Sequence, residues 1–194
     1  MITIIDYGAG NLKSVQNALD RLGATYEVTD DPAVVAKAEK VIFPGVGAAG
    51  SAMKELRRRG LAGPLKNLKV PLLGICLGMQ LLFEFSEEDE TKCLGIFLGQ
   101  VNRFEDENLK VPQMGWNAVK FGGNCPLFKD VPDESYFYFV HSYFAPLLTE
   151  TCGVSLYGRP FSAAVQKDNF YGLQFHPEKS GEVGLQILRN FIEL

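Results

Sequence analysis

The sequence predicts an α/β protein with a three-layer, doubly wound and mostly parallel sheet. Before residue 90, short apolar runs alternate with segments whose apolar residues recur at helical spacing. That alternation is typical of parallel strands joined by helices that cover both faces of the sheet. After residue 90, short β-rich segments are separated by turn residues, and helical patterns are sparse until the end. We therefore expect the C-terminal half to add mixed or antiparallel strands to the same sheet.

Composition and charge narrow the class of protein. Of the 194 residues, 46% are hydrophobic and 22% are charged, and no linker-like stretch interrupts them, so we expect one domain over 1–194. A net charge of −4 and a pI near 5.3 argue against nucleic acid as a partner. The longest apolar stretch, residues 70–83, contains a proline, glycines and a glutamine, so no membrane span is expected.

The cysteines and the start of the chain predict a reducing, cytoplasmic location. The four cysteines are widely spaced without a Cys-x-x-Cys pair, so neither a zinc site nor a disulfide framework is indicated: Cys76, Cys93, Cys125 and Cys152. Residues 2–5 already read as a strand, with no basic region or cleavage site before them, so no signal peptide is expected. We expect neither a metal nor a cofactor.

The first elements follow in order. Residues 2–6 predict a strand and residues 7–11 a glycine-rich turn, and Asn11 stands where the next helix needs an N-cap. The turn faintly resembles a dinucleotide-binding loop, but the third glycine and the later acidic residue are not convincingly placed. Residues 26–28 predict a second strand, and Asp31-Pro32 starts a second helix.

A third strand, residues 41–43, runs into Pro-Gly-Val-Gly at 44–47, and a helix follows over 48–59. Glycines at the carboxyl end of a parallel strand let the backbone approach a ligand and change conformation. The arginines that end this helix complement its dipole and predict a solvated face. Ligands in such sheets bind beyond the carboxyl ends of the strands, which makes residues 44–47 a candidate site.

The most informative stretch is residues 70–80. An apolar strand breaks at Gly74, Cys76 follows between two glycines, and a helix-forming run begins at Met79 and ends at Phe83. Gly-x-Cys-x-Gly between a strand and a helix is the cysteine form of the nucleophile elbow. The helix N-terminus favours the thiolate form of the cysteine. The alternative interpretation is a buried, inert cysteine at a glycine-punctuated strand end.

In the second half, turn residues are expected at 105–108, 122–124 and 132–134. Residues 136–140 predict a strand that ends at His141, and residues 163–165 and 171–175 predict a closing hairpin. The final helix is indicated by apolar residues at helical spacing, which are Val183, Ile187, Leu188, Phe191 and Ile192.

The search for a general base is short because the chain has two histidines. His176 is followed by Pro177 and Glu178, and residues two apart in extended backbone point to the same side. Glu178 is thus placed to accept the second N–H of the imidazole and to set its orientation. His141 is the competitor, with no carboxylate so closely tied to it, and its alternative interpretation is a satisfied histidine at a strand end.

Residues 74–80 and 176–178 resemble the triad (class I) glutamine amidotransferases, whose flavodoxin-like fold agrees with the predicted sheet. Further segments narrow the resemblance to the glutaminase subunits of imidazole glycerol phosphate synthases; these segments are residues 6–12, 44–47, 115–117, 140–143 and 175–181. Two positions depart from that family's pattern. Gln113 stands where histidine is expected, and Ala49 where phenylalanine is usual.

The resemblance implies that Cys76 attacks the carboxamide of glutamine to give a glutamyl thioester and ammonia, while His176 moves the proton and Glu178 orients it. It implies an oxyanion hole made of backbone N–H groups from Leu77 and from Val46 or Gly47. It also implies a set of residues around the substrate: Gly45, Gln80, Glu88 (for the ammonium group), Ser142 and Tyr143. For Gln80, Glu88, Ser142 and Tyr143, the plainer interpretations are helix surface, loop or strand end.

The resemblance further implies that the ammonia passes to a (β/α)₈-barrel cyclase subunit, which makes imidazole glycerol phosphate in histidine biosynthesis. Four residues match positions that face this partner, namely Asn11, Trp116, Tyr138 and Lys179. Trp116 as a core residue and Lys179 as a solvated helix start are the alternatives. Two other functions stay open, which are another elbow-type cysteine enzyme, such as a glutaminase of a different synthase or a hydrolase, and a non-catalytic regulatory module.

Overall fold

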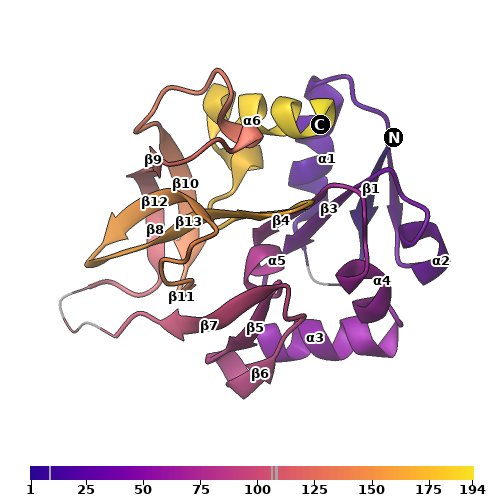
Figure 1. Cartoon of the computed structure of the whole chain (residues 1–194), viewed down its shortest axis with the longest axis horizontal. Helices are drawn as coiled ribbons and strands as arrows, with labels where there is room; N and C mark the ends of the chain where they lie inside the picture. The colour runs from indigo at the N-terminus through magenta and orange to yellow at the C-terminus, as the bar shows by residue number, and fades with distance from the viewer. Residues whose placement is uncertain (9, 106, 108) are drawn as a thin grey trace.

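A twisted eight-stranded sheet forms the centre of the molecule (Figure 1). The computed structural model describes residues 1–8, 10–105, 107 and 109–194. The strands lie in the order β2-β1-β3-β4-β14-β13-β12-β9. Their bounds are β1 Ile2–Ile5, β2 Tyr26–Thr29, β3 Lys40–Gly45, β4 Leu72–Cys76, β9 Lys120–Phe121, β12 Thr151–Tyr157, β13 Arg159–Lys167 and β14 Phe170–Leu173.

The sheet confirms the predicted fold class. Strands β2, β1, β3, β4 and β14 pair in parallel, and β13, β12 and β9 continue the sheet with antiparallel pairing. The expected hairpin at residues 163–175 is present as the antiparallel pair β13–β14. The antiparallel strands thus come from the C-terminal half, as the change of pattern after residue 90 indicated.

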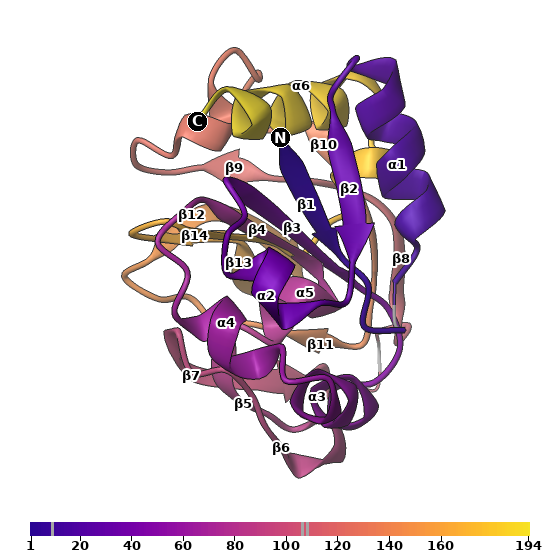
Figure 2. The ribbon, with the colours of Figure 1, turned by 90° about the vertical axis from the view of Figure 1, so that its right-hand side faces the viewer.

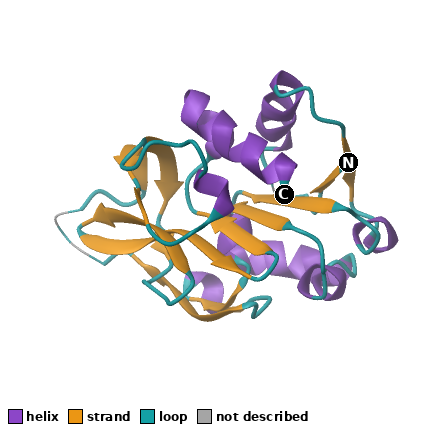
Figure 3. Ribbon diagram, turned by 45° about the horizontal axis from the view of Figure 1, so that its top comes forward, coloured by secondary structure: helices purple, strands orange, loops and turns teal. Residues whose placement is uncertain are grey.

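Helices cover both faces of the sheet (Figures 2 and 3). One face packs against α1 (Leu12–Arg21) and α6 (Gly181–Glu193), and the other against α3 (Ala49–Arg58), α4 (Ala62–Lys66) and α5 (Leu77–Gln80). The short α2 (Pro32–Val35) begins at Asp31, whose carboxylate accepts a hydrogen bond from the N–H of Ala33. Successive side chains of a strand point to opposite faces. Ile4 therefore joins the core under α1 and α6, while Ile5 joins the core under α3.

The helix expected over residues 79–83 is wrong beyond Gln80. Residues 83–86 instead form strand β5 of a second sheet, in the order β11-β7-β5-β6. The bounds are β5 Phe83–Ser86, β6 Thr91–Lys92, β7 Phe97–Arg103 and β11 Tyr143–Phe144. The carbonyl of Leu82 accepts hydrogen bonds from the N–H groups of Ile96 and Phe97, which end the helix there. An all-apolar run has no periodicity that separates helix from strand, and here tertiary pairing decides.

Strands β8 (Gln113–Ala118) and β10 (Tyr136–His141) pair as a separate antiparallel ribbon. The strand expected at 136–140 is therefore confirmed, but the expectation that the C-terminal strands all join one sheet is wrong. Three short 3₁₀ turns complete the elements: η1 Glu88–Glu90, η2 Pro126–Phe128 and η3 Pro177–Lys179. Of the expected turns, residue 9 in the first and residues 106 and 108 in another lie outside the described residues.

The carboxyl ends of β3, β4 and β14 lie side by side, and β10 and β11 approach them from the second half of the chain. Several segments that are distant in sequence therefore meet at one edge of the main sheet. In the described part of the chain, no helix has the length and apolar character that crossing a bilayer demands.

Candidate active site

The elbow at Cys76 is a direct turn from strand into helix. Strand β4 ends at Cys76 and α5 begins at the next residue, and Cys76 has φ 54° and ψ −111°. A positive φ is uncommon for any residue with a Cβ and marks local backbone strain. A Cβ built on Gly78 would overlap the carbonyl oxygen of Phe43, and one on Gly74 would lie 2.8 Å from the backbone nitrogen of Met79. Both glycines are thus needed because backbone packs on backbone around the sulfur.

His176 and Glu178 form a buried pair. Nδ1 of His176 lies 2.8 Å from Oε1 of Glu178, and their side chains are 3% and 2% exposed. The backbone N–H of His176 donates to the carbonyl of Tyr138, so the ribbon β8–β10 anchors the segment that carries the histidine. The two residues pair as expected, but the backbone between them is not extended, because Pro177–Lys179 forms the 3₁₀ turn η3 and only His176 has extended φ and ψ.

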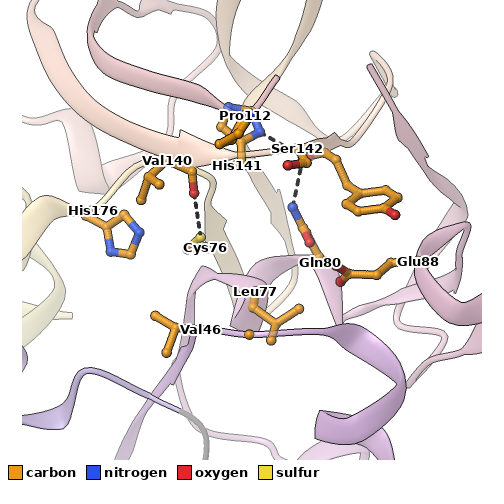
Figure 4. Close-up of a pocket in the computed structure, with 12 residues that line it drawn as sticks. Val46, Cys76, Leu77, Gln80, Glu88, Pro112, Val140, His141, Ser142 and His176 are labelled. Carbon is orange, nitrogen blue, oxygen red and sulfur yellow. Dashed lines mark hydrogen bonds between the residues drawn. The ribbon is translucent and has the colours of Figure 1, made fainter. Parts of the chain in front are cut away.

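His176 and Cys76 both line one cavity, and the second ring nitrogen of His176, Nε2, is not bonded to Glu178. Within the described residues, Nε2 of His176 has no hydrogen-bond partner. Burial by itself lowers the pKa of His176, but the nearby Cys76 and Glu178 outweigh it and raise the pKa to about 10. His176 therefore holds a proton at neutral pH. Figure 4 shows the His176 ring and the Cys76 sulfur at one end of the cavity, with Gln80 and Glu88 further along it.

This cavity has a volume of about 340 Å³. Three of its lining residues are those expected for the oxyanion hole, namely Val46, Gly47 and Leu77. Four more are those expected around the substrate, namely Gln80, Glu88, Ser142 and Tyr143. Gly45 is placed differently: it ends β3 in register with Cys76, and a Cβ on it would lie 2.5 Å from the hydroxyl of Tyr7. Gly45 thus packs beneath the elbow and is not among the residues that line the cavity.

Glu88 connects the cavity to the loop that follows β3. Its Oε2 accepts a hydrogen bond of 2.8 Å from the N–H of Ala49, the first residue of α3. Burial raises the pKa of Glu88, and the hydrogen bond from Ala49 acts in the opposite direction. A carboxylate at a helix N-terminus is stabilised by the unpaired N–H groups there. Ala49, which stands where phenylalanine is usual in the family, is fully buried. Its hydrogen bond to Glu88 connects it to a residue that lines the cavity.

Sequence reasoning missed Gln174, which is completely buried next to the elbow. Its Nε2 lies 3.8 Å from Sγ of Cys76, and its Oε1 accepts a hydrogen bond of 2.9 Å from Nε2 of Gln80. Gln174 follows the end of β14 at Leu173, in a bend that leads to His176, and no local pattern in the sequence marks its contact with the elbow. Val140 was also missed, and its carbonyl oxygen lies 3.8 Å from Sγ of Cys76.

His141, the competing base, has both ring nitrogens engaged elsewhere. Nδ1 lies 2.7 Å from the carbonyl oxygen of Tyr143, and Nε2 lies 3.0 Å from Oε1 of the Gln113 side chain. Burial lowers the pKa of His141 to about 4, and the charge of His176 acts in the same direction. His141 is therefore neutral and bonded on both sides, and the geometry favours His176 as the base.

The four residues expected at a partner surface lie near the histidine end of the cavity. Trp116 is 56% exposed and stacks edge to face on Tyr138 at a centroid distance of 6.2 Å. Nζ of Lys179 lies 5.8 Å from the centroid of the Tyr138 ring. Asn11 caps α1 by accepting from the N–H of Ser14, and it lines a small cavity together with Glu178. Trp116 is thus a surface residue and not part of the core.

A parallel sheet whose central strand ends in a cysteine elbow, beside a His-Pro-Glu segment, defines a class of protein. The class is the class I glutamine amidotransferases, and the model of that family, "Glutamine amidotransferase class-I", matches residues 3–194. A solved structure described as a glutamine amidotransferase has the same fold, with a TM-score of 0.76 at 17% identity, covering 100% of this chain and 98% of that one.

Closer relatives are subunits of one enzyme. The imidazole glycerol phosphate synthase subunit HisH of Haemophilus influenzae is 52% identical over 192 residues, covering 99% of this chain and 96% of its own length. The subunit of the same name from Bacteroides fragilis is 50% identical, covering 100% of this chain and 99% of its own length. The chain belongs to the class I glutamine amidotransferases and, within them, to the HisH family.

Proposed function

We propose that the chain hydrolyses glutamine through a Cys76 thioester and supplies the ammonia to a (β/α)₈-barrel cyclase subunit. The cyclase would use it to make imidazole glycerol phosphate and aminoimidazole carboxamide ribotide in histidine biosynthesis. The observation that carries the proposal is the convergence of Cys76 with the buried His176–Glu178 pair at one cavity. Membership of the HisH family supplies the pathway, since its relatives are subunits of imidazole glycerol phosphate synthase.

In the first half of the reaction, the Cys76 thiolate adds to the carboxamide carbon of glutamine. The negative charge that develops on the carbonyl oxygen is held by the N–H of Leu77 and by one from Val46 or Gly47, each donor contributing about 3–4 kcal/mol. Protonated His176 then gives its Nε2 proton to the leaving nitrogen. The C–N bond breaks, ammonia leaves, and a glutamyl thioester remains with neutral His176.

In the second half, neutral His176 takes a proton from a water molecule as that water adds to the thioester carbon. The C–S bond breaks and the sulfur leaves as thiolate, so that the thiolate and protonated His176 are both restored. The glutamic acid formed loses its proton to solvent. Glu178 accepts the Nδ1–H of His176 throughout, which keeps Nε2 directed toward the reacting atoms.

The residues that line the cavity support glutamine as the substrate. Glu88 offers a carboxylate for the α-ammonium group, and the backbone of Ser142 and Tyr143 offers contacts for the α-carboxylate. Gln80 holds that backbone by donating 2.9 Å to the carbonyl oxygen of Tyr143. The partner is proposed to lie over Trp116, Tyr138 and Lys179, so that ammonia leaves on the histidine side.

The test of the proposed function is the variant Cys76→Ala in complex with the barrel subunit. Synthesis that depends on glutamine should be lost, while synthesis from added ammonium salt should remain, because the thiol serves only the hydrolysis. Cys93→Ala is the matched control, since Cys93 is also buried but is not among the residues that line the cavity. Loss of both activities in a folded Cys76→Ala complex would reject the division of labour. Glutamine-dependent synthesis that survives the substitution would reject Cys76 as the nucleophile, and an unaltered complex that uses no glutamine would favour the non-catalytic module.

A further inference from the structure

A row of four buried polar side chains lies at the substrate side of the cavity, and two of them, Gln80 and His141, line it. Its four members are each no more than 6% exposed: Gln80, Gln113, His141 and Gln174. Buried polar groups cost stability unless each one is hydrogen-bonded, so the orientation of every donor and acceptor in such a row is constrained. Figure 4 shows the bonds that reach from His141 and from Gln80 toward the backbone next to Ser142.

The carbonyl of Tyr143 is the centre of this row. It accepts a hydrogen bond of 2.9 Å from Nε2 of Gln80 and lies 2.7 Å from Nδ1 of His141. A carbonyl oxygen only accepts, so Nδ1 of His141 carries a hydrogen. The pKa of His141 is lowered to about 4, mainly by burial, so the ring is neutral near pH 7. A neutral imidazole has one N–H, and Nε2 therefore presents a lone pair.

Gln113 is the group that this lone pair meets. The atom placed 3.0 Å from Nε2 is Oε1 of the Gln113 amide, and the pairing of β8 with β10 sets Gln113 directly opposite His141. Two acceptors do not bond to each other, so we assign the amide the opposite orientation, in which its NH₂ group and not Oε1 faces the lone pair. The two ends of an amide have nearly the same shape, and its orientation is assigned from its partners.

We propose that Gln113 is a positioning residue for glutamine binding. Its amide donates to Nε2 and holds His141 as the Nδ1–H tautomer, and that tautomer clamps the Tyr143 carbonyl. The inference rests on the proposed function, because the backbone of Ser142 and Tyr143 is the proposed contact for the glutamine carboxylate. Gln113 thus does in this chain, with an amide, what a ring N–H would do if histidine stood there.

The tautomer is measured first, on the unaltered chain. With ¹⁵N-labelled histidine, the spectrum contains the ring nitrogens of two residues, because the chain has two histidines. Long-range ¹H–¹⁵N correlations at pH 7 should show one ring, assigned to His141 by its loss in His141→Asn, with a protonated Nδ1 and an unprotonated Nε2. A protonated Nε2 on His141 would overturn the proposal whatever the kinetics show.

Kinetics of the complex with the barrel subunit then test the positioning role. Gln113→Leu keeps the size of the side chain but removes the donor, and should raise the KM for glutamine about tenfold with kcat changed less than about twofold. Gln113→His restores a ring donor and should return KM to near the unaltered value. Gln166→Leu, the same chemical change on β13, is the matched control and should leave KM unchanged.

The outcomes separate the donor from mere packing. If Gln113→Leu binds glutamine normally, or if Gln113→His is as impaired as Gln113→Leu, the donor has no role and the proposal is wrong. If Gln113→Leu does not fold, the tautomer of the unaltered chain and the KM of Gln113→His decide. A complex that uses no glutamine at all would reject the proposed function, while the tautomer measurement would still decide how Gln113 is bonded.

Discussion

Cys76 has an unfavourable backbone conformation for a residue with a side chain. Its φ of 54° with ψ −111° lies outside the regions that such residues usually occupy. Conformations of this kind cost on the order of 1–3 kcal/mol each and persist where the surroundings leave no alternative. Here the packing of Gly74 and Gly78 against neighbouring backbone holds the turn. The strain has a purpose in the proposed mechanism, because it presents the sulfur to the cavity.

At the same scale, Glu178→Gln should lower glutamine turnover on the order of 10²-fold with little change in KM. Glutamine keeps the shape of the side chain but removes the charge that stabilises protonated His176. Steady-state glutaminase kinetics of the complex measure both quantities. Glu182→Gln is the control, because Glu182 is an exposed residue of α6 that pairs with Arg21. Unchanged turnover in Glu178→Gln would mean that another group orients His176.

The same variant should also shift the pH profile. Contacts with Cys76 and Glu178 raise the pKa of His176 to about 10, so the unaltered enzyme keeps the proton for the leaving ammonia until the pH approaches that value. Glu178→Gln removes one of the two groups that raise the pKa of His176, so the pKa of His176 should fall. The alkaline limb of kcat should therefore move to lower pH in Glu178→Gln, and a shift to higher pH would contradict this electrostatic account.

At the scale of elements, α5 sits directly on β3 because Gly78 has no side chain. A Cβ there would overlap the carbonyl oxygen of Phe43, and backbone of the central sheet cannot yield as a flexible side chain can. We expect Gly78→Ala to lower the free energy of unfolding by about 3 kcal/mol or more. Urea denaturation of the isolated chain measures the change.

Gly122→Ala is the matched control for that substitution. Gly122 lies in the loop after β9 without a positive φ, and among the described residues no atom beyond its chain neighbours stands within 4 Å of the Cβ that alanine would add. Alanine in place of glycine at a position without strain stabilises a protein by about 0.4–1 kcal/mol, so this variant should be as stable as the unaltered chain or slightly more stable. Equal effects of the two substitutions would show that overlap with β3 does not govern the elbow.

At the scale of the whole molecule, the cavity is closed by segments from both halves of the chain. The loop after β3 contributes Val46, which is 40% exposed, and Gly47, which has a φ of +100°. Glycines on both sides of Val46 lower the steric cost of turning over the peptide that would hold the oxyanion. We infer that the barrel partner favours the active orientation through contacts near Asn11 and Lys179, as a population shift between two backbone states.

The isolated chain should consequently have very low glutaminase activity. A missing oxyanion donor costs about 10²–10³ in rate, which is enough to suppress turnover at rest. The rate of glutamine hydrolysis should be compared in the isolated chain, in the complex with the barrel subunit, and in that complex with the nucleotide substrate of the cyclase bound. The rate should rise along that series. Equal rates in all three would refute the switch but would leave the proposed roles of Cys76 and His176 intact.

The sequence by itself determined the α/β class, the alternation of parallel strands with helices in the first half of the chain, and the position of the elbow. These features depend on local patterns: apolar alternation, a cysteine between spaced glycines, and a His-Pro-Glu segment that keeps its imidazole and carboxylate close together. The pairing of His176 with Glu178 could be predicted because both residues lie on one short segment.

Only the tertiary structure decided what depends on contacts between distant segments. Residues 81–83 are uniformly apolar, so no local signal shows that they leave the helix and pair with residues near 97. The separation of β8–β10 from the main sheet is likewise a matter of which strands pair. The bonding of His141 to Gln113 joins positions 28 residues apart. The protonation state and the tautomer of a histidine are set by such partners and by burial. Neither property can therefore be predicted from the residues next to the histidine in the sequence.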